Sequence, residues 1–396
     1  MVNRITLART LPVVALALVV AGGARAQGTL VALQTDVDQI ARRARPSVVT
    51  VCAVRSEAAP KTAAGAPAPH VRTRVGSGVA VDEHLIVTTA SVALQAERLL
   101  VSTANALQVE AEIVGVDPVF NLAVLRVPDL RLPTLRFATG RPARVGDWVI
   151  SLGTSYNGEP TQSLGNVAQR HREPGQGLLQ LTNTVYPGNS GAALLDIRGE
   201  LVGLVTGELG FPVLTDSEGN GQRRSGGTSF AMPVETLRRV FESLKREGRV
   251  RHGYLGVKTL AASLESDREG GPSTPLGAQV DGIVGGGPAQ RLGLRAGDLI
   301  VAYDGERVET PEQLARWVLA TPPGRRVNLV WVRRDIGYDG AVVLDESPDR
   351  VLEWLAGAPA DPQPGGPRKI AELDREIRRL SQELGRLKDE SGPPQR

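Results

Sequence analysis

The segment from Asn183 to Leu195 constrains this chain more than any other stretch of its sequence. It reads Asn-Thr-Val-Tyr-Pro-Gly-Asn-Ser-Gly-Ala-Ala-Leu-Leu, so a proline and two glycines force a tight turn with Ser190 at its apex, beside apolar β-type runs. A serine in such a turn lifts its hydroxyl clear of the backbone. The N–H groups of Gly188, Asn189 and Ser190 then point at one spot, where an oxyanion forms during acyl transfer. The segment therefore predicts a nucleophile position with an oxyanion hole.

The sequence around this turn resembles a known family. Pro-Gly-Asn-Ser-Gly, which ends at Gly191, is followed by a Leu-Leu-Asp-x-x-Gly-Glu-Leu-Val-Gly pattern. Both are similar to the nucleophile segment of the HtrA/DegP family, whose members are trypsin-fold serine proteases with C-terminal PDZ domains. The resemblance runs from about Ile40 to about Arg334 and covers most of the chain. It implies a double six-stranded β-barrel with the cleft between the barrels, followed by an α+β PDZ domain.

The spacing of short apolar runs also predicts a mainly β fold. Gly, Pro or Asp punctuates nearly every gap between these runs, which indicates an all-β barrel or sandwich. Residues 56–72 are rich in Ala and Pro and read as a flexible surface loop. An amphipathic helix over Pro233–Glu247 closes the barrel region. The expected strands cover residues 48–54, 75–81, 85–89, 99–103, 110–116, 122–127, 148–152, 166–169 and 178–183.

The amino terminus has the features of a secretory signal. Arg4 and Arg9 precede the apolar run Leu11–Ala21, and an Ala-x-Ala cleavage pattern ends at Ala26. The apolar run is too short to cross a bilayer, which needs about 20 residues. Cleavage removes three of the 46 Lys and Arg residues, which leaves as many basic as acidic side chains, 43 of each, and a formal net charge of zero. The sequence shows no basic patch of the kind that binds nucleic acid. We therefore expect an exported protein, periplasmic or extracellular, with no stable membrane span and no nucleic-acid partner.

The catalytic partners of Ser190 are replaced at the positions that the resemblance assigns to them. The family histidine segment, Leu-Thr-Asn-x-His-Val-Val, matches a segment that places Ser91 at the histidine. The family aspartate segment, Asp-Pro-x-x-Asp-Leu-Ala-Val-Leu, matches one that places Asn121 at the aspartate. A serine hydroxyl needs a base to take its proton, and a subtilisin without its histidine loses on the order of 10⁶ in kcat. These replacements predict a catalytically impaired pseudoprotease, in which the Gly-rich turn is kept for its backbone geometry.

Another histidine in the role of base is the alternative. The sequence contains four histidines, at positions 70, 84, 171 and 252, and we expect each to be solvated. His84 precedes Ser91 along an extended segment by roughly 15–20 Å at about 3.3 Å per residue. The alternative function is an active serine endopeptidase of envelope protein quality control that uses Ser190 with an unidentified base.

A second group of motifs resembles an HtrA-type PDZ domain. Gly-Leu-x-x-Gly-Asp-x-Ile spans residues 293–300, and Tyr-Leu-Gly-Val at 254–257 matches the loop whose N–H groups bind a peptide carboxylate. Thr310 is an expected N-cap for a helix that ends at about Ala320, and this helix lines the peptide groove or only packs the core. A PDZ domain that binds no peptide is a further alternative. The expected peptide-binding residues are Tyr254, Leu255, Gly256, Val257, Leu314 and Val318.

The carboxyl terminus carries a heptad pattern after a Pro/Gly-rich stretch. Apolar residues at a and d positions between Ile370 and Leu387 favour a parallel two-stranded coiled coil, with a helix docked on its own chain as the alternative. The predicted domains are a signal peptide (1–26), an HtrA-type protease-fold domain (27–248), a PDZ domain (251–335), a linker (336–368) and a coiled-coil helix (369–390).

These patterns lead to three functional hypotheses. The first is an adaptor or chaperone that binds unfolded or C-terminal peptide segments and forms a homo-oligomer through the coiled coil, protease-domain contacts or both. The second is the active endopeptidase, and the third is an oligomeric scaffold whose partner joins through the coiled coil. We expect no cofactor and no metal, and Cys52, the single cysteine, leaves no internal disulfide.

Overall fold

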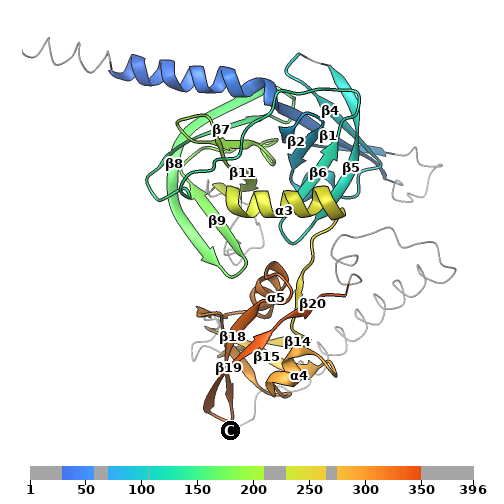
Figure 1. Cartoon of the computed structure of the whole chain (residues 1–396), viewed down its shortest axis with the longest axis vertical. Coiled ribbons are helices and arrows are strands. Elements are labelled where there is room, and N and C mark those ends of the chain that lie inside the picture. Colours follow the sequence, from blue (N-terminus) through green and yellow to red (C-terminus); the bar gives the residue numbers. More distant parts are fainter. Residues whose placement is uncertain (1–28, 58–69, 106, 209–228, 265–273, 349–396) are drawn as a thin grey trace, which may run out of the picture. The chain divides into compact units, whose positions relative to one another are not determined.

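Figure 1 shows the computed structural model of the chain. It describes residues 29–57, 70–105, 107–208, 229–264 and 274–348. The predicted signal peptide (1–26) and coiled coil (369–390) lie outside these residues. Of the helices in the described ranges, none is both long and apolar enough to span a bilayer.

The first six strands form a closed antiparallel barrel, in the order β1-β2-β3-β6-β5-β4. A helix over residues 29–44 and the 3-10 turn η1 (Arg45–Ser47) precede the barrel, and the short helix α2 (Ala90–Ala93) follows β3. Apolar side chains such as Val51, Ile86 and Leu125 fill the inside. The strands are β1 (Val48–Glu57), β2 (His70–Asp82), β3 (Leu85–Thr88), β4 (Arg98–Ser102), β5 (Gln108–Asp117) and β6 (Leu122–Arg126).

The next six strands close a second antiparallel barrel, in the order β10-β11-β12-β9-β8-β7. Helix α3 (Val234–Glu247) follows it, with its apolar face buried as predicted, and ends at Gly248 in the left-handed conformation. Residues of α3 and of both barrels belong to one hydrophobic core, which fixes the barrels against each other. The strands are β7 (Trp148–Thr154), β8 (Pro160–Glu173), β9 (Gln176–Leu181), β10 (Ala193–Leu195), β11 (Leu201–Glu208) and β12 (Ser229–Pro233).

The remaining described residues form a smaller α+β unit with a core of its own. Its main sheet has the order β14-β15-β16-β18-β19, with β17 paired to β16, while β13 pairs with β20. The mainly β architecture, a trypsin-like double barrel followed by a PDZ domain, is therefore confirmed. Its elements are β13 (Gly253–Tyr254), β14 (Val257–Leu264), β15 (Thr274–Ile283), α4 (Pro288–Leu292), β16 (Leu299–Tyr303), β17 (Glu306–Arg307), α5 (Pro311–Ala320), β18 (Arg326–Arg333), β19 (Ile336–Val343) and β20 (Asp345–Glu346).

Two predicted boundaries are wrong. The linker expected from residue 336 begins instead with β19 and β20, which complete the PDZ sheets. The loop expected over residues 56–72 overlaps two strands, because β1 continues to Glu57 and β2 starts at His70. Pairing with a neighbouring strand supplies the hydrogen bonds that keep these segments extended.

The buried carboxylate Asp298 makes the stability of the PDZ domain pH-dependent. Arg333 donates to both of its oxygens at 2.6 and 2.7 Å, and the Arg295 N–H donates at 2.7 Å. Burial disfavours the ionised form, but these hydrogen bonds outweigh burial and leave the pKa of Asp298 below its ordinary value. Because the pKa of Asp298 is lower in the folded than in the unfolded protein, its ionised form stabilises the fold at pH values above the unfolded pKa of about 3.9. This stabilisation is lost as the pH falls through the pKa of the folded protein.

We therefore expect the wild type to lose unfolding free energy between about pH 5 and 3. Arg333→Met is expected to cost about 2 kcal/mol at neutral pH, because it removes charge-assisted hydrogen bonds. It is also expected to abolish this acid-induced loss, because its unpaired buried carboxyl has a raised pKa. Urea unfolding of both proteins across this pH range measures both effects, and equal acid sensitivity of the two proteins would refute the assignment.

Candidate functional site

The predicted nucleophile Ser190 lies in the connection between β9 and β10, and the turn that holds it tolerates only glycine at one position. Gly188 has φ of +101°, and a Cβ there would come within 2.5 Å of the Ser155 carbonyl carbon. Ser77 on β2 holds the turn from the first barrel. Its hydroxyl donates to the Gly188 carbonyl at 2.8 Å, and its N–H donates to the Ser190 carbonyl at 2.8 Å. The buried Ser77 therefore ties the nucleophile turn to the opposite barrel.

Two of the three predicted oxyanion donors are free. Among the described residues, no acceptor is bonded to the N–H of Gly188 or of Ser190. The Asn189 N–H donates to the Tyr186 carbonyl at 2.9 Å, so it is not available to an oxyanion. The Asn189 side chain accepts from the Tyr186 N–H at 2.8 Å and donates to Thr161 Oγ1 at 2.6 Å. Asn189 therefore braces the turn, and the other two N–H groups remain as donors.

Ser91 and Asn121 lie next to each other and belong to the surroundings of Ser190. The Ser91 N–H donates to Asn121 Oδ1 at 2.8 Å. Helix α2, which carries Ser91, and the nucleophile turn both approach Gly76 of β2, because a Cβ added there would lie 2.5 Å from Val92 and 2.9 Å from the Ser190 carbonyl oxygen. The three positions that the resemblance assigns to the triad therefore lie in neighbouring segments of the fold.

Among the described residues, the positions matched to the family histidine and aspartate carry no general base. Asn121 keeps a hydrogen-bond acceptor at the aspartate position but carries no charge, and Ser91 offers a hydroxyl in place of a ring nitrogen. The cation that contacts Ser91 is Arg74, which donates to the Ser91 carbonyl. Within the described part of the chain, the Ser190 hydroxyl has no hydrogen-bond partner. The site therefore retains oxyanion donors and a hydroxyl, with no described group that takes the hydroxyl proton.

His84 and His171 are engaged away from Ser190. Nδ1 of His84 lies 3.0 Å from the Leu130 carbonyl oxygen, and Nε2 of His171 lies 3.0 Å from Gln180 Oε1. Both are partly buried rather than fully solvated. His70 opens β2, opposite Glu57 of β1. Neither His84 nor His171 contacts Ser190.

His252 was expected to be solvated and is instead buried. Its Nε2 lies 2.6 Å from Asp117 Oδ2, its Nδ1 lies 2.8 Å from the Leu319 carbonyl oxygen, and its ring stacks on Phe120. The other oxygen of Asp117 accepts from the Phe120 N–H at 2.7 Å. The same carboxylate therefore binds His252 and holds the turn that presents Asn121. The sequence offered only the Asp-Pro pair at Asp117 as a signal for this contact.

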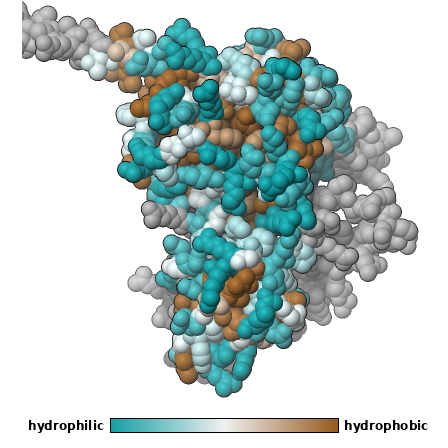
Figure 2. Space-filling model, viewed as in Figure 1, coloured by the Kyte–Doolittle hydropathy of each residue, from teal (hydrophilic) through white to brown (hydrophobic). Residues whose placement is uncertain are grey.

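Two exposed tyrosines flank the nucleophile turn and were missed in the sequence. Tyr156 is 71% exposed, and its backbone nitrogen lies 2.6 Å from the position of a Cβ on Gly188. Tyr186 is 48% exposed and precedes the turn directly. Figure 2 shows hydrophobic residues gathered in patches among hydrophilic ones on one face of the molecule. Tyr186 directly precedes the Pro-Gly pair of the turn, and this position was the available sequence signal for its exposure.

The predicted carboxylate loop of the PDZ domain has free donors. The carbonyls of Leu255 and Gly256 accept from Ala289 and Val284, both at 2.9 Å. No acceptor among the described residues is bonded to the N–H of Leu255 or Gly256. Gly256 has φ of +78°, which turns the backbone at this point. Two successive free N–H groups are suited to bind a carboxylate.

The remaining predicted peptide-binding residues take different places. Tyr254 is partly exposed in β13, and Val257 starts β14, an edge strand that is open to a further strand. Leu314 and Val318 are 2% and 7% exposed and belong to the PDZ core. The predicted helix α5 therefore packs the core through these two residues, which present little surface to a peptide.

Comparisons with known proteins agree with this architecture. The family model of the trypsin-like peptidase domain matches residues 76–204, and that of the PDZ domain matches residues 279–333. A probable periplasmic serine endoprotease, DegP-like, of Hahella chejuensis is 30% identical over 285 residues, which are 71% of this chain and 59% of the relative. A serine endoprotease structure from Yersinia pestis has a TM-score of 0.54 at 27% identity, covering 79% of this chain and 98% of that chain.

A second solved structure, the HtrA-type protease AlgW with a decapeptide, has a TM-score of 0.55 at 25% identity, and the match covers 78% of this chain and 98% of that chain. The chain spans 53% to 59% of the length of the curated relatives named DegP-like. The chain is thus similar to these proteins over most of its own length. The chain belongs to the HtrA/DegP family of trypsin-fold proteins with a PDZ domain.

Proposed function

We propose that this chain is a pseudoprotease that binds polypeptides without cutting them and acts as an adaptor or chaperone in the cell envelope. The observation that carries the proposal is that Ser91 and Asn121, which are hydrogen-bonded to each other, stand at the histidine and aspartate positions of the triad. Neither side chain takes up a proton as a base. Among the described residues, none forms a hydrogen bond with the Ser190 hydroxyl.

The size of the catalytic loss favours binding over cleavage. In serine proteases without a working triad, the oxyanion hole and substrate binding alone accelerate the reaction roughly 10³–10⁴-fold over the rate in water. This acceleration is negligible for the hydrolysis of peptide bonds. The two free N–H groups of Gly188 and Ser190 are the feature that favours the alternative, an active endopeptidase with an unidentified base. They serve equally well to hold a peptide carbonyl without reacting with it.

Two surfaces support the binding of polypeptides. Tyr156 and Tyr186 expose aromatic rings beside the nucleophile turn, and tyrosine is enriched where proteins bind one another. The N–H groups of Leu255 and Gly256 suit the carboxylate of a C-terminal peptide. An HtrA-type relative solved with a decapeptide adds support for peptide as the ligand class. The expected homo-oligomer belongs to the same proposal, because several copies bind one extended chain more tightly.

Relatives named periplasmic support the expected export of the protein. We therefore place the proposed activity in the periplasm or outside the cell, where unfolded chains and their termini are exposed.

Labelling with a fluorophosphonate tests the absence of an activated nucleophile. This reagent reacts stoichiometrically with the catalytic serine of an active hydrolase, because a neighbouring base activates the serine hydroxyl as a nucleophile. We expect the purified full chain to remain unlabelled, like its Ser190→Ala variant. Stoichiometric labelling that disappears in Ser190→Ala would support the endopeptidase instead.

Gly256→Ala is expected to weaken the binding of a C-terminal peptide about tenfold, because the added methyl disturbs the loop that donates to the carboxylate. Gly324→Ala is the matched control. The two glycines have φ of +78° and +79°, so both variants carry similar backbone strain, but nothing lies within 4 Å of a Cβ at Gly324. Fluorescence anisotropy measures the affinity for one peptide with a free C-terminal carboxylate and for the same peptide with an amidated C-terminus. Equal affinities for both peptides in the wild type would mean that this loop does not bind carboxylates.

A further inference from the structure

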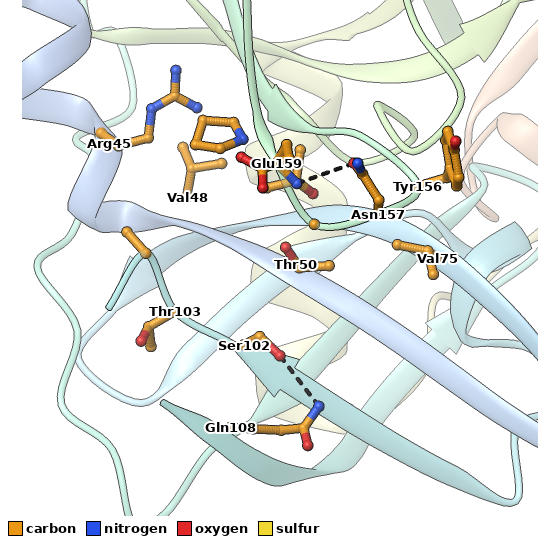
Figure 3. A pocket seen from close by; sticks show the side chains of 14 residues that line it. Arg45, Val48, Thr50, Val75, Ser102, Thr103, Gln108, Tyr156, Asn157 and Glu159 are labelled. Carbon is orange, nitrogen blue, oxygen red and sulfur yellow. Dashed lines mark hydrogen bonds between the residues drawn. The ribbon is translucent and has the colours of Figure 1, made fainter. Parts of the chain in front are cut away.

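A cavity of about 580 Å³ opens between the two barrels, next to the Ser190 site but apart from it. Figure 3 shows it, with walls from β1, β2 and β4 of the first barrel and from the turn between β7 and β8 of the second. Arg45, in η1, lies at one end of the view, whereas Ser102 and Gln108 lie at the other. The polar lining side chains between these ends include those of Thr50, Thr103 and Asn157.

Arg45 brings a positive charge to this cavity without a carboxylate to neutralise it. Its guanidinium donates to the carbonyls of Gly153 at 2.9 Å and Thr161 at 3.2 Å. No carboxylate of the described residues forms an ion pair with it. The side chain is half-buried, and desolvation lowers the pKa of its guanidinium. Because buried charges in proteins are normally paired, the cavity favours an anionic occupant.

The guanidinium retains capacity for such an occupant. It has five N–H donors, and the two carbonyls take one from each terminal nitrogen. A carboxylate fits the planar fork of an arginine better than any other common protein group. Thr50 also lines the cavity and carries a hydroxyl that can donate, whereas the Thr103 hydroxyl donates to the Leu107 carbonyl at 3.4 Å.

The cavity and the nucleophile turn share a wall. Thr154 lines the cavity, and its N–H donates to Ser77 Oγ at 2.9 Å, while the Ser77 N–H donates to the Ser190 carbonyl at 2.8 Å. Tyr156 also lines the cavity and abuts Gly188 of the oxyanion turn. A polypeptide held at Ser190 therefore passes the mouth of this cavity within a few extended residues, at about 3.3 Å each.

We propose that this cavity, the Arg45 pocket, receives an acidic side chain, Asp or Glu, of a polypeptide bound beside Ser190. The inference rests on the proposed function of the barrels in polypeptide binding. Glu159 also lines the pocket, is exposed, and carries the same charge as the ligand. Arg45 and Glu159 therefore act in opposite directions on the affinity for an acidic segment.

The test uses the full chain and a fluorescent, flexible peptide that contains two glutamates, compared with the same peptide carrying glutamines. Both peptides are amidated at the carboxyl end, so the PDZ loop does not contribute. We expect the glutamate peptide to bind about tenfold more tightly, since charge-assisted hydrogen bonds form only with the carboxylate. Arg45→Gln is expected to abolish this preference and Arg45→Lys to retain part of it, whereas Glu159→Gln is expected to strengthen glutamate binding about two- to fivefold.

The variants separate a lost pocket from a lost fold. Arg45 also joins η1 to the second barrel through Gly153 and Thr161, so the thermal unfolding of Arg45→Gln is compared with that of the wild type. Glu159→Gln changes an exposed side chain and predicts a gain, which misfolding does not produce. Equal binding of both peptides to the wild type, or a preference that survives Arg45→Gln, overturns the acidic pocket while polypeptide binding stands. If neither peptide binds, polypeptide binding by the barrels is itself refuted, and the pocket with it.

Discussion

Ser91→His combined with Asn121→Asp is expected to turn the chain into a working endopeptidase, with casein cleavage raised about 10³-fold or more over the wild type. The expectation follows from the size of the loss in proteases without these groups, on the order of 10⁶ in kcat for the histidine. The triad residues act as a unit and their effects on kcat are not additive, so the histidine and the aspartate must both be restored for the full gain in activity.

The backbone is already arranged for the restored pair. The Ser91 N–H donates to Asn121 Oδ1 at 2.8 Å, and an aspartate has an oxygen for the same bond and another for the imidazole. Ser91 is exposed, which leaves space for the larger ring. The N–H groups of Gly188 and Ser190 are free to stabilise the oxyanion.

Single and triple variants serve as controls for this gain. Ser91→His alone is expected to stay close to the wild-type rate, because an amide in place of the aspartate favours the wrong imidazole tautomer. Adding Ser190→Ala to the double variant is expected to abolish cleavage. A folded double variant that leaves casein intact would show that the site is inert for a reason other than its missing base.

His252→Ala is expected to lower the unfolding free energy by about 3–5 kcal/mol, because it leaves the buried carboxylate of Asp117 without its partner. Asp117 is 2% exposed and His252 is 1% exposed, so water does not replace the lost contact. The corresponding drop in Tm is about 10 °C for a domain of this size. Differential scanning calorimetry measures it.

A double-mutant cycle assigns this cost to the pair. Asp117→Asn is expected to destabilise the wild type and to restore part of the stability of His252→Ala, since the amide needs no counter-charge. Additive effects, or a loss below about 1 kcal/mol for His252→Ala, would contradict a structural role for this contact.

Local sequence signals predicted much of the fold because each acts within a few residues. Pro and Gly around Ser190 indicated a turn, and Gly188 adopts the positive φ that a tight turn requires. Thr310 indicated a helix start, and its hydroxyl accepts from the Gln313 N–H at 3.2 Å. The alternation of apolar residues likewise predicted most barrel strands.

Features that depend on distant or atypical residues were not predicted. His252 and Asp117 are separated by 135 positions, so no local pattern signals their contact. The turn before β19 uses Arg334 and Asp335, both with positive φ, where Asn-Gly or Asp-Gly is the usual signal. Asn189 was placed among the oxyanion donors because the sequence does not reveal which N–H groups the turn itself uses.

The central claim is that no group in this chain takes the proton of Ser190. Incubation of purified wild type and Ser190→Ala with unfolded casein tests it most directly, with intact casein measured over time. The account predicts that casein stays intact to the same extent with both proteins. Cleavage by the wild type that disappears in Ser190→Ala would contradict the account and show an active protease.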